Sequence, residues 1–266
     1  MCLTADRRDA RLRSVLVYSY SYRNNRIHLR ADGRTRVGFT LVELVVVIAI
    51  LSVLAALAMP VYFGARELPR RTTCASSLRQ IGLAFSMYLA DWDGAFPNTG
   101  DPYLWMGRRW RWPLAPYLGE ALSGDPERPA DPLHSTRTPR ILVCPSDATA
   151  PEKYDSTSYG YSAAFYHSPT QIAAMTTADL WQLDRFRCVT QKESAVAFPA
   201  QKVLAAEWLT NHTSPSVGWW DWRGARNYLF VDGHVNYLAA RRLHAGVSGL
   251  PDPNLTVGGV GGKDVE

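Results

Sequence analysis

Seven ionisable side chains could be combined into an acid–base or metal-binding site: Asp91, Asp93, Asp147, His167, Asp184, Glu207 and His212. Carboxylates and imidazoles can exchange protons near neutral pH or ligate a cation. Such chemistry is usually marked by fixed spacings, and the chain has no Gly-x-Ser-x-Gly, no His-Glu-x-x-His and no phosphate-binding loop. The sequence therefore predicts no catalytic residue and no enzyme.

The stretch Asp91-Trp92-Asp93-Gly94 places two carboxylates at alternate positions, as calcium-binding loops do. The other ligands of such a loop are missing. Gly94 is also the residue type that ends many helices, and Pro97 prevents a helix from continuing. We favour an ordinary helix-ending turn here and predict no metal.

A different kind of chemistry concerns Glu43, the one charge in an otherwise apolar run from Leu41 to Phe63. As a helix this run would rise about 34 Å, enough for a hydrocarbon core of about 30 Å, and no polar stripe interrupts it. A carboxylate within a membrane costs on the order of 3 kcal/mol and usually has a partner. A cleaved signal peptide, for which Ala58 would offer a small-residue cleavage site, and a plain anchor both leave Glu43 unexplained.

The stretch RVGFTLVELVVVIAILSVLAALAMP resembles the N-terminal segment of type IV prepilins and of type II secretion pseudopilins. The match rests on Gly38, Phe39, Thr40, Leu41 and Glu43. The resemblance implies that a membrane peptidase cuts between Gly38 and Phe39 and methylates the new amine of Phe39. It also implies that Glu43 pairs with that amine on a neighbouring subunit, an attraction that a low dielectric strengthens. Glu43 would then align subunits as a fibre grows.

The same resemblance implies four kinds of partner. They are the prepilin peptidase/N-methyltransferase, other pilin-like subunits in a homo- or hetero-oligomeric fibre, an inner-membrane assembly platform, and membrane lipid. It implies no cofactor, although some pseudopilin heads hold calcium.

Basic residues lie on both sides of the apolar run. Arg34 and Arg36 precede it, so the positive-inside tendency predicts a cytoplasmic N-terminus and an exported head. Arg66, Arg70 and Arg71 follow it and weaken that tendency. The expected location is the bacterial inner membrane, as a single-pass protein, and then a periplasmic or cell-surface fibre.

Two further stretches, CASSLRQIGLAFSMYLADWDGAFP and NYLFVDGHV, resemble a bacterial subfamily of pseudopilin-like proteins. Its C-terminal domain is named for a His, nine residues and Asp-Gly. Asp232 and Gly233 match that element, but Trp222 stands at the position of the His. We therefore carry over only the hairpin turn, which an Asp-Gly between β-rich runs also predicts by itself. His234 is interpreted as an exposed strand residue, not as a ligand.

The basic character of the chain is concentrated in residues 1–38. The whole chain has 29 Lys and Arg against 24 Asp and Glu, and residues 1–38 hold nine Arg and three Asp. The rest has 20 basic and 21 acidic residues, so its net charge is −1 and we expect no nucleic-acid partner. The stretch RRWRW (108–112) could stack on bases or sugars, but we favour Trp packing against Arg side chains.

Beyond the apolar run, apolar residues recur mostly three and four positions apart and predict an amphipathic helix: Leu78, Ile81, Leu83, Phe85, Met87, Tyr88 and Leu89. Pro60 and Pro69 should kink the helix or interrupt it locally. Four later stretches predict short strands: RILVCPSD, SYGYSAAFY, KVLAAEWL and the hairpin NYLFVDGHVNYL.

The predicted fold class is α+β, with a long N-terminal hydrophobic stem helix followed by a small antiparallel β-sheet head, as in pilins. We divide the chain into a basic leader (1–38), the transmembrane and assembly half of the stem (39–63), its amphipathic half (64–93), a globular head with a C-terminal hairpin (94–245) and a flexible tail (246–266).

Four cysteines are present, of which Cys2 lies in the leader. No pair has Cys-x-x-Cys spacing, which argues against a zinc site. An exported head would lie in an oxidising compartment, where disulfides persist. We favour a disulfide between Cys74 and Cys144, and a Cys144–Cys188 pair is nearly as well supported.

These observations predict a structural subunit, major or minor, of a type II secretion pseudopilus or a type IV pilus-like fibre. The alternative is a single-pass envelope protein whose head binds glycan or another surface polymer without forming a fibre. Fibre assembly should depend on Glu43, whereas a solitary anchored protein should tolerate its loss.

Overall fold

The computed structural model describes residues 38–100, 110–118, 140–149, 157–181 and 185–266. The leader up to residue 37, with Cys2, lies outside these residues, and so does Asp184. The chain divides into two units, Met1–Ser52 and Val53–Glu266, and each is described by itself.

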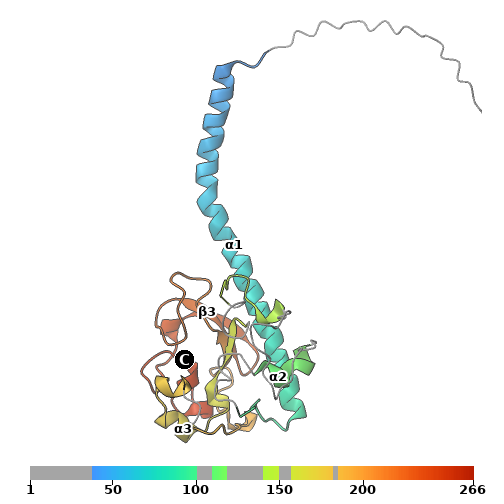
Figure 1. The fold of residues 1–266 in the computed structure, drawn as a ribbon, viewed down its shortest axis with the longest axis vertical. Coiled ribbons are helices and arrows are strands. Elements are labelled where there is room, and N and C mark those ends of the chain that lie inside the picture. The colour runs from blue at the N-terminus through green and yellow to red at the C-terminus, as the bar shows by residue number, and fades with distance from the viewer. Residues whose placement is uncertain (1–37, 101–109, 119–139, 150–156, 182–184) are drawn as a thin grey trace, which may run out of the picture. The chain divides into compact units, whose positions relative to one another are not determined.

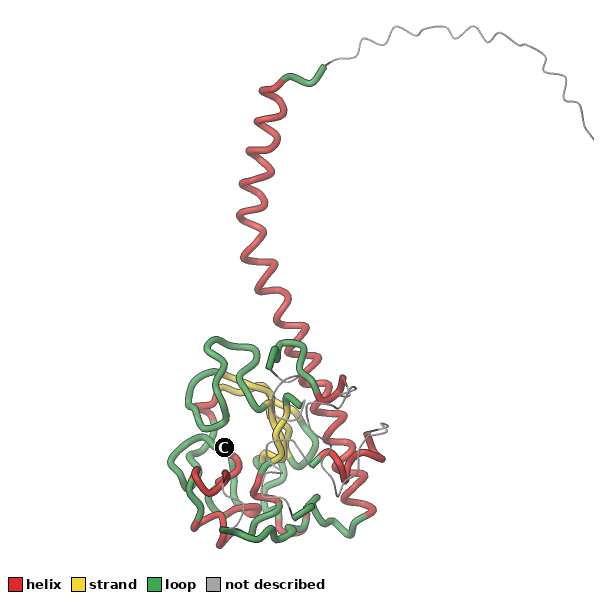
Figure 2. The backbone as a smooth tube through the Cα atoms, in the orientation of Figure 1, coloured by secondary structure: helices red, strands yellow, loops and turns green. Residues whose placement is uncertain are grey.

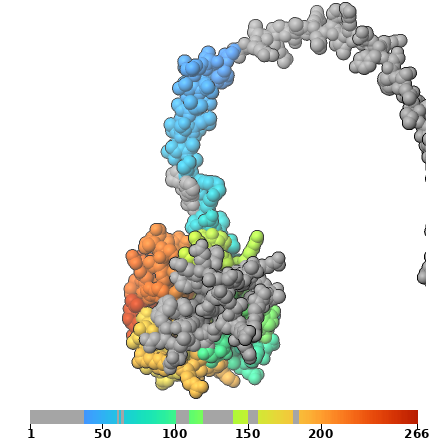
Figure 3. All heavy atoms as spheres, in the orientation of Figure 1, coloured from blue at the N-terminus to red at the C-terminus, as the bar shows by residue number. Residues whose placement is uncertain are grey.

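The longest element is α1 (Leu41–Asp91), a helix of 51 residues (Figure 1). Its stretch Leu41–Met59 is apolar over 19 residues and 0 % buried. In Figure 3 these side chains, drawn in blue, form the outer surface of the helix. By length and composition the stretch can cross a membrane.

Pro60 and Pro69 were predicted to kink the helix or to interrupt it locally, and of these two outcomes the interruption is wrong, because α1 continues through both residues. Each proline removes one backbone hydrogen bond, and the bonds before and after it keep the helix in register. Next to Pro69, the hydroxyls of Thr72 and Thr73 donate to the carbonyls of Leu68 and Pro69, each at 3.0 Å.

The C-terminal part of α1 buries one face. Its buried residues lie three and four apart, as a helix with one apolar stripe requires: Cys74, Ser77, Leu78, Ile81, Ala84, Phe85, Tyr88 and Leu89. The helix ends where Gly94, with φ of 69°, donates its N–H to the carbonyl of Leu89 at 2.8 Å. This is the left-handed glycine cap expected from the sequence.

The head contains a four-stranded antiparallel sheet, drawn in yellow in Figure 2. Its strands follow each other in space in chain order: β1 (Tyr159–Tyr161), β2 (Val203–Glu207), β3 (Ala225–Phe230) and β4 (Val235–Ala239). The α+β class predicted from the sequence is confirmed.

A tight turn joins β3 to β4 at Asp232 and Gly233. Gly233 has φ of 87° and donates to the carbonyl of Phe230 at 2.9 Å. Phe230 in turn donates to the carbonyl of His234 at 2.9 Å. A glycine is favoured at this position because a side chain rarely adopts a positive φ.

Helix α1 packs directly against β1 and β3. A Cβ added to Gly82 would lie 2.8 Å from Cδ1 of Leu229, so helix and strand approach more closely than a larger residue would allow. Beside this contact, the rings of Phe85 and Tyr161 lie 5.2 Å apart. The core therefore sits between the buried face of α1 and the sheet.

Two of the predicted strands differ from the structure. In RILVCPSD the residues Arg140–Leu142 form a 3-10 helix, and the N–H of Val143 donates to the carbonyl of Arg140 at 3.2 Å instead of to a neighbouring strand. In SYGYSAAFY only Tyr159–Tyr161 is strand. A second 3-10 helix, Ala163–Phe165, follows, and the hydroxyl of Ser162 caps it by accepting from the N–H of Ala164.

The described part of the head also contains two short α-helices. They are α2 (Arg111–Leu114) and α3 (Pro169–Ala174), the latter with a capping box at Ser168. Trp110, just before α2, is fully buried and stacks on Phe85 at 5.7 Å between ring centroids. It cannot serve as a stacking platform for bases or sugars; the Arg residues at 108 and 109 lie outside the described residues.

The prediction of a flexible tail is wrong, because residues 246–266 pack into the head. Lys202 is fully buried, and its Nζ lies 3.1 Å from Oδ2 of Asp264. The same oxygen accepts the N–H of Val203 at 2.8 Å, so the end of the chain is tied to β2. Glycine and proline content suggested mobility, but the distant Lys202 supplies the contacts that order the segment. Its buried residues include Asp252, Asn254, Leu255, Thr256, Val260, Asp264 and Val265.

Candidate functional site

Glu43 takes part in a reciprocal cap at the start of α1. Its Oε2 accepts the backbone N–H of Thr40 at 2.9 Å and the Thr40 hydroxyl at 2.7 Å. The backbone N–H of Glu43 in turn donates to the Thr40 hydroxyl at 3.3 Å. This Thr-x-x-Glu arrangement is a capping box, which satisfies N–H groups at a helix start. This local role was not among the predictions, although the Thr-x-x-Glu spacing of Thr40 and Glu43 indicates it.

Gly38 lies just before this cap, at the predicted cleavage position. A Cβ added to it would meet nothing within 4 Å among the described residues. No contact in the described part of the chain therefore requires a glycine here. Phe39, the predicted new N-terminus, is 75 % exposed.

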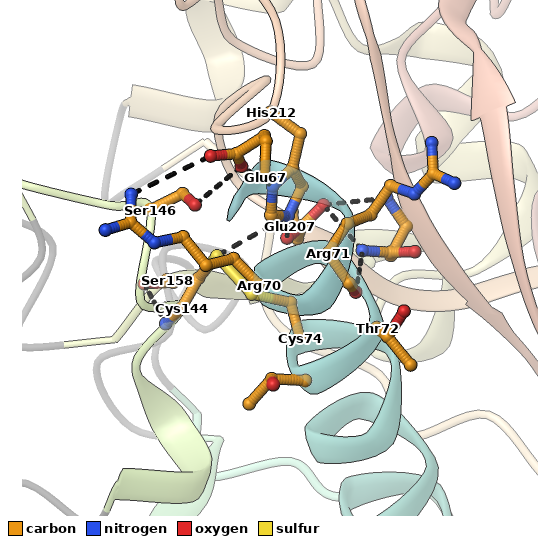
Figure 4. Close-up of polar contacts among 12 residues, drawn as sticks. Glu67, Arg70, Arg71, Thr72, Cys74, Cys144, Ser146, Ser158, Glu207 and His212 are labelled. Atoms are coloured by element: carbon orange, nitrogen blue, oxygen red, sulfur yellow. Dashed lines mark hydrogen bonds and ion pairs between the residues drawn. A yellow bond between two sulfur atoms is a disulfide. The ribbon is translucent and has the colours of Figure 1, made fainter. Parts of the chain in front are cut away.

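A buried polar cluster lies in the head, far along the chain from Glu43. His212 lies between two carboxylates (Figure 4). Its Nδ1 is 2.5 Å from Oε1 of Glu67, and its Nε2 is 2.8 Å from Oε1 of Glu207. Glu67 comes from α1, Glu207 ends β2, and His212 lies in the loop that follows β2. The side chains of His212 and Glu207 are 1 % and 0 % exposed.

Neighbouring groups hold both carboxylates in place. The backbone N–H and the side-chain amide of Asn227 donate to Oε2 of Glu207 at 2.8 and 3.2 Å. The hydroxyl of Ser146 donates to Oε1 of Glu67 at 2.6 Å. Arg70 lies 3.8 Å from the other oxygen of Glu67. Each carboxylate therefore has a donor besides His212.

The electrostatics of the cluster follow from burial and pairing. Burial lowers the pKa of His212, but the hydrogen bonds and charges of Glu207 and Glu67 outweigh it and leave the pKa raised. Burial likewise raises the pKa of Glu67, yet the hydrogen bonds from Ser146 and His212 bring it below its ordinary value. The arrangement favours a protonated imidazole beside the ionised carboxylate of Glu67.

A disulfide lies against this cluster. Cys74 on α1 is bonded to Cys144, with 5.2 Å between their Cα atoms, and this is the pair that we favoured. Sγ of Cys144 lies 3.6 Å from Nε2 of His212. The remaining described cysteine, Cys188, is not part of this disulfide. In the chain-entropy account, a link across 70 residues stabilises by about 4 kcal/mol.

Most of the other ionisable candidates serve the fold. Asp91 accepts a hydrogen bond from the Tyr117 hydroxyl at 2.8 Å, and Asp93 has φ of 50° in the turn that ends α1. His167 is buried, which lowers its pKa to about 4. Asp147 is buried. Among the described residues, only Glu207 and His212 of the original candidates meet in a cluster of metal-ligating side chains.

The residues at the positions of the His, nine residues and Asp-Gly pattern, with the neighbouring His234, do not form a polar cluster. Trp222, at the position of the missing His, is 41 % exposed. His234 stacks on Phe230 at 4.3 Å between ring centroids, and its Nδ1 lies 2.6 Å from Oδ1 of Asp232. It lies just before β4 and is exposed.

Comparison with known proteins agrees with the geometry of the N-terminal segment. Residues 38–59 match the prokaryotic N-terminal methylation motif, and residues 64–199 match a family described as a protein of unknown function, DUF1559. The chain is thus a prepilin-like protein, a class of structural subunits. It belongs to the DUF1559 family, whose matched region covers half of its length. No curated protein and no solved structure matches the chain.

Proposed function

We propose that this protein is a subunit of a type II secretion pseudopilus or a type IV pilus-like fibre. Prepilin peptidase would cut between Gly38 and Phe39, and the apolar part of α1 would hold the protein in the inner membrane with its head exported. Other pilin-like subunits and an assembly platform in the membrane would be its partners. The methylation motif over residues 38–59 and the unburied apolar stretch Leu41–Met59 support this proposal.

The observation that carries the proposal is the single carboxylate, Glu43, in that apolar stretch. In the structure Glu43 caps its own helix through Thr40. A cap alone would be served equally well by glutamine, which is the other residue found at this position of a capping box. A charge is required only if Glu43 also pairs with a cation, and the amine of a neighbouring Phe39 would provide one within the membrane.

The test separates the cap from the charge. Glu43→Gln keeps the cap and removes the charge, Thr40→Ala removes the cap and keeps the charge, and Glu43→Ala removes both. Each variant is expressed in a strain without the wild-type protein, and fibres sheared from the cells are compared with the membrane fraction. We expect all three to be inserted and cleaved, but only Thr40→Ala to enter sheared fibres.

Two results would contradict the proposal. If Glu43→Gln entered fibres at the wild-type level, Glu43 would be a helix cap and no more. If wild-type protein never left the membrane fraction, the protein would be an anchored envelope protein whose head binds a glycan or surface polymer.

A further inference from the structure

We propose that Cys74, Cys144, Glu207 and His212 form a zinc site when the Cys74–Cys144 disulfide is reduced. One ligand atom from each of these residues lies within 4.8 Å of the others. Two thiolate sulfurs, an imidazole nitrogen and a carboxylate oxygen form a set that tetrahedral Zn²⁺ binds. With four protein ligands the site would be closed, as structural zinc sites are, and would leave no position for a substrate.

The distances around His212 suit a metal at the centre of the four ligands. Nε2 lies 2.8 Å from Oε1 of Glu207 and 3.6 Å from Sγ of Cys144. Atoms bound to one tetrahedral zinc at about 2.0–2.3 Å lie roughly 3.3–3.8 Å from each other. Small side-chain shifts, together with separation of the two sulfurs once their bond is broken, would bring the four atoms to this spacing.

A second layer of hydrogen bonds already orients the ligands. The carboxylate of Glu67 lies 2.5 Å from Nδ1 of His212 and so directs Nε2 toward the other ligands. This carboxylate–histidine arrangement is typical of metal-bound histidine. Asn227 donates twice to Oε2 of Glu207, and the hydroxyl of Ser158 accepts the N–H of Cys144 at 2.9 Å.

The disulfide alone does not explain why buried polar side chains lie beside it. A disulfide packs well among apolar side chains, whereas a buried carboxylate and imidazole cost free energy unless they are fully paired. Here Glu207 and His212 are buried directly beside the sulfurs, at 0 % and 1 % side-chain exposure. A site that must hold a cation in one of its states explains why such groups lie there.

The disulfide must be reduced before zinc can bind its sulfur atoms. A thiol or phosphine reductant supplies two electrons, the S–S bond breaks, and two protons from solvent complete the thiols. Zn²⁺ then displaces one proton from each thiol and the proton on Nε2 of His212, all three passing to solvent, as two Zn–S bonds and one Zn–N bond form. The disulfide and the zinc use the same sulfur atoms, so the two states exclude each other.

Either state links the same parts of the head. Cys74 lies on α1, Cys144 follows the 3-10 helix Arg140–Leu142, Glu207 ends β2, and His212 lies in the next loop. Zinc would therefore hold these elements together before the disulfide forms. Because four separate elements supply one ligand each, the sequence shows no Cys-x-x-Cys spacing, which had argued against zinc.

The test uses the full-length protein in detergent with Co²⁺ as a spectroscopic probe. The protein is reduced with a phosphine without oxygen, the reductant is removed, and Co²⁺ and then Zn²⁺ are added. We expect one Co²⁺ per chain, with thiolate charge-transfer absorption and the intense visible bands of a tetrahedral site, and displacement by Zn²⁺. The disulfide form should bind neither ion in this way.

Variants assign the ligands. Cys144→Ser and His212→Ala should abolish the tetrahedral spectrum or weaken binding by more than tenfold. Glu67→Ala should weaken binding by about 10- to 100-fold and keep the tetrahedral spectrum, as expected of an outer-layer partner. Cys188→Ser is the matched control, because Cys188 lies outside the cluster, and it should change nothing.

A second measurement shows which cysteines bind the metal even if reduction of the disulfide loosens the fold. Zn²⁺ should protect Cys74 and Cys144, but not Cys188, from alkylation by iodoacetamide, as peptide mapping would show. The proposal is overturned if the reduced protein binds no Co²⁺, if binding lacks the thiolate absorption, or if zinc leaves the alkylation of Cys74 and Cys144 unchanged.

Discussion

A fold requires a glycine where a side chain would collide or where φ is positive. At Gly38 a collision gives no such reason, since a Cβ there would meet nothing within 4 Å among the described residues. We propose that the requirement comes from a peptidase that binds an extended backbone at the membrane face. We expect Gly38→Val to leave most of the protein at full length, and we expect wild-type protein to begin at methylated Phe39. Intact-mass measurement of the membrane fraction distinguishes these products.

The competing small-residue site at Ala58 provides the control for this prediction. Ala58→Leu would disable cleavage by a signal peptidase after residue 58. It should leave the mature end at Phe39. A mature protein that begins after Ala58, or wild-type protein that keeps residues 1–38, would contradict processing at Gly38.

Asp252 is a buried carboxylate whose environment disfavours its charge. Burial raises its pKa from 3.8 to about 6, although the N–H of Asn254 donates to its Oδ1 at 2.9 Å. Its other oxygen, Oδ2, has no hydrogen-bond partner among the described residues. Between about pH 4 and pH 6 the folded state therefore binds a proton more tightly than the unfolded state. The free energy of unfolding should fall as pH rises through this window.

The substitution Asp252→Asn tests the direction in which the free energy of unfolding changes with pH. Asparagine keeps the oxygen that caps the 3-10 helix Pro253–Leu255 and removes the titration. The free energy of unfolding of the variant minus that of wild type should be about 1–3 kcal/mol larger at pH 7.5 than at pH 4. Urea unfolding, followed by tryptophan fluorescence at both pH values, gives the difference. A difference between the proteins that is equal at both pH values would show that Asp252 does not titrate in this range.

At the scale of elements, the buried stripe of α1 makes a quantitative prediction. Leu78 is fully buried against the sheet, whereas Leu83 is 63 % exposed on the other side of the same helix. Leu78→Ala should lower the free energy of unfolding by about 2–5 kcal/mol, because it removes buried methyl groups and leaves a cavity. Leu83→Ala should change it by less than about 0.5 kcal/mol. Equal losses in urea unfolding would mean that α1 packs through a different face.

Local patterns were sufficient to predict several elements. The three- and four-residue spacing predicted the amphipathic part of α1, and Asp232-Gly233 predicted the β3–β4 turn. The strand β2 follows from its apolar residues. The strand predicted for RILVCPSD is wrong because Leu142 and Cys144 are buried by contacts with other segments. Their apolar character indicates burial but does not indicate pairing with another strand. The prediction of a flexible tail is wrong for the same reason, since Lys202 and Asp264 come into contact only in the folded chain.

The polar cluster in the head depends on such distant contacts throughout. Glu67 and His212 are 145 residues apart, and the packing of α1 brings them together. Glu207 and His212 are close in sequence, but nothing in their spacing indicates that both face Cys144. By contrast, the N-terminal residues Gly38, Phe39 and Glu43 lie in one short segment, so a sequence motif is sufficient to identify them.

For the whole molecule, charge around the apolar stretch sets the expected orientation. Within about 18 residues on its N-terminal side lie five arginines, and within the same distance on its C-terminal side lie three. The first group is Arg23, Arg26, Arg30, Arg34 and Arg36, and the second is Arg66, Arg70 and Arg71. The difference favours a cytoplasmic leader and an exported head, but it is small.

Because the difference is small, orientation should be easy to disturb. Replacing the five near arginines by glutamine leaves the basic residues that lie close to the apolar stretch only on its head side, so we expect a substantial fraction of heads to stay in the cytoplasm. Proteinase K added to spheroplasts should digest the wild-type head and leave part of the variant's head protected until the membrane is lysed. The matched control replaces Arg7, Arg8, Arg11 and Arg13, which lie farther from the apolar stretch, and should behave as wild type. If the wild-type head were protected, it could neither join an exported fibre nor form its disulfide in an oxidising compartment. In that case the dithiol state, and with it the zinc site, would be the resting state of the head.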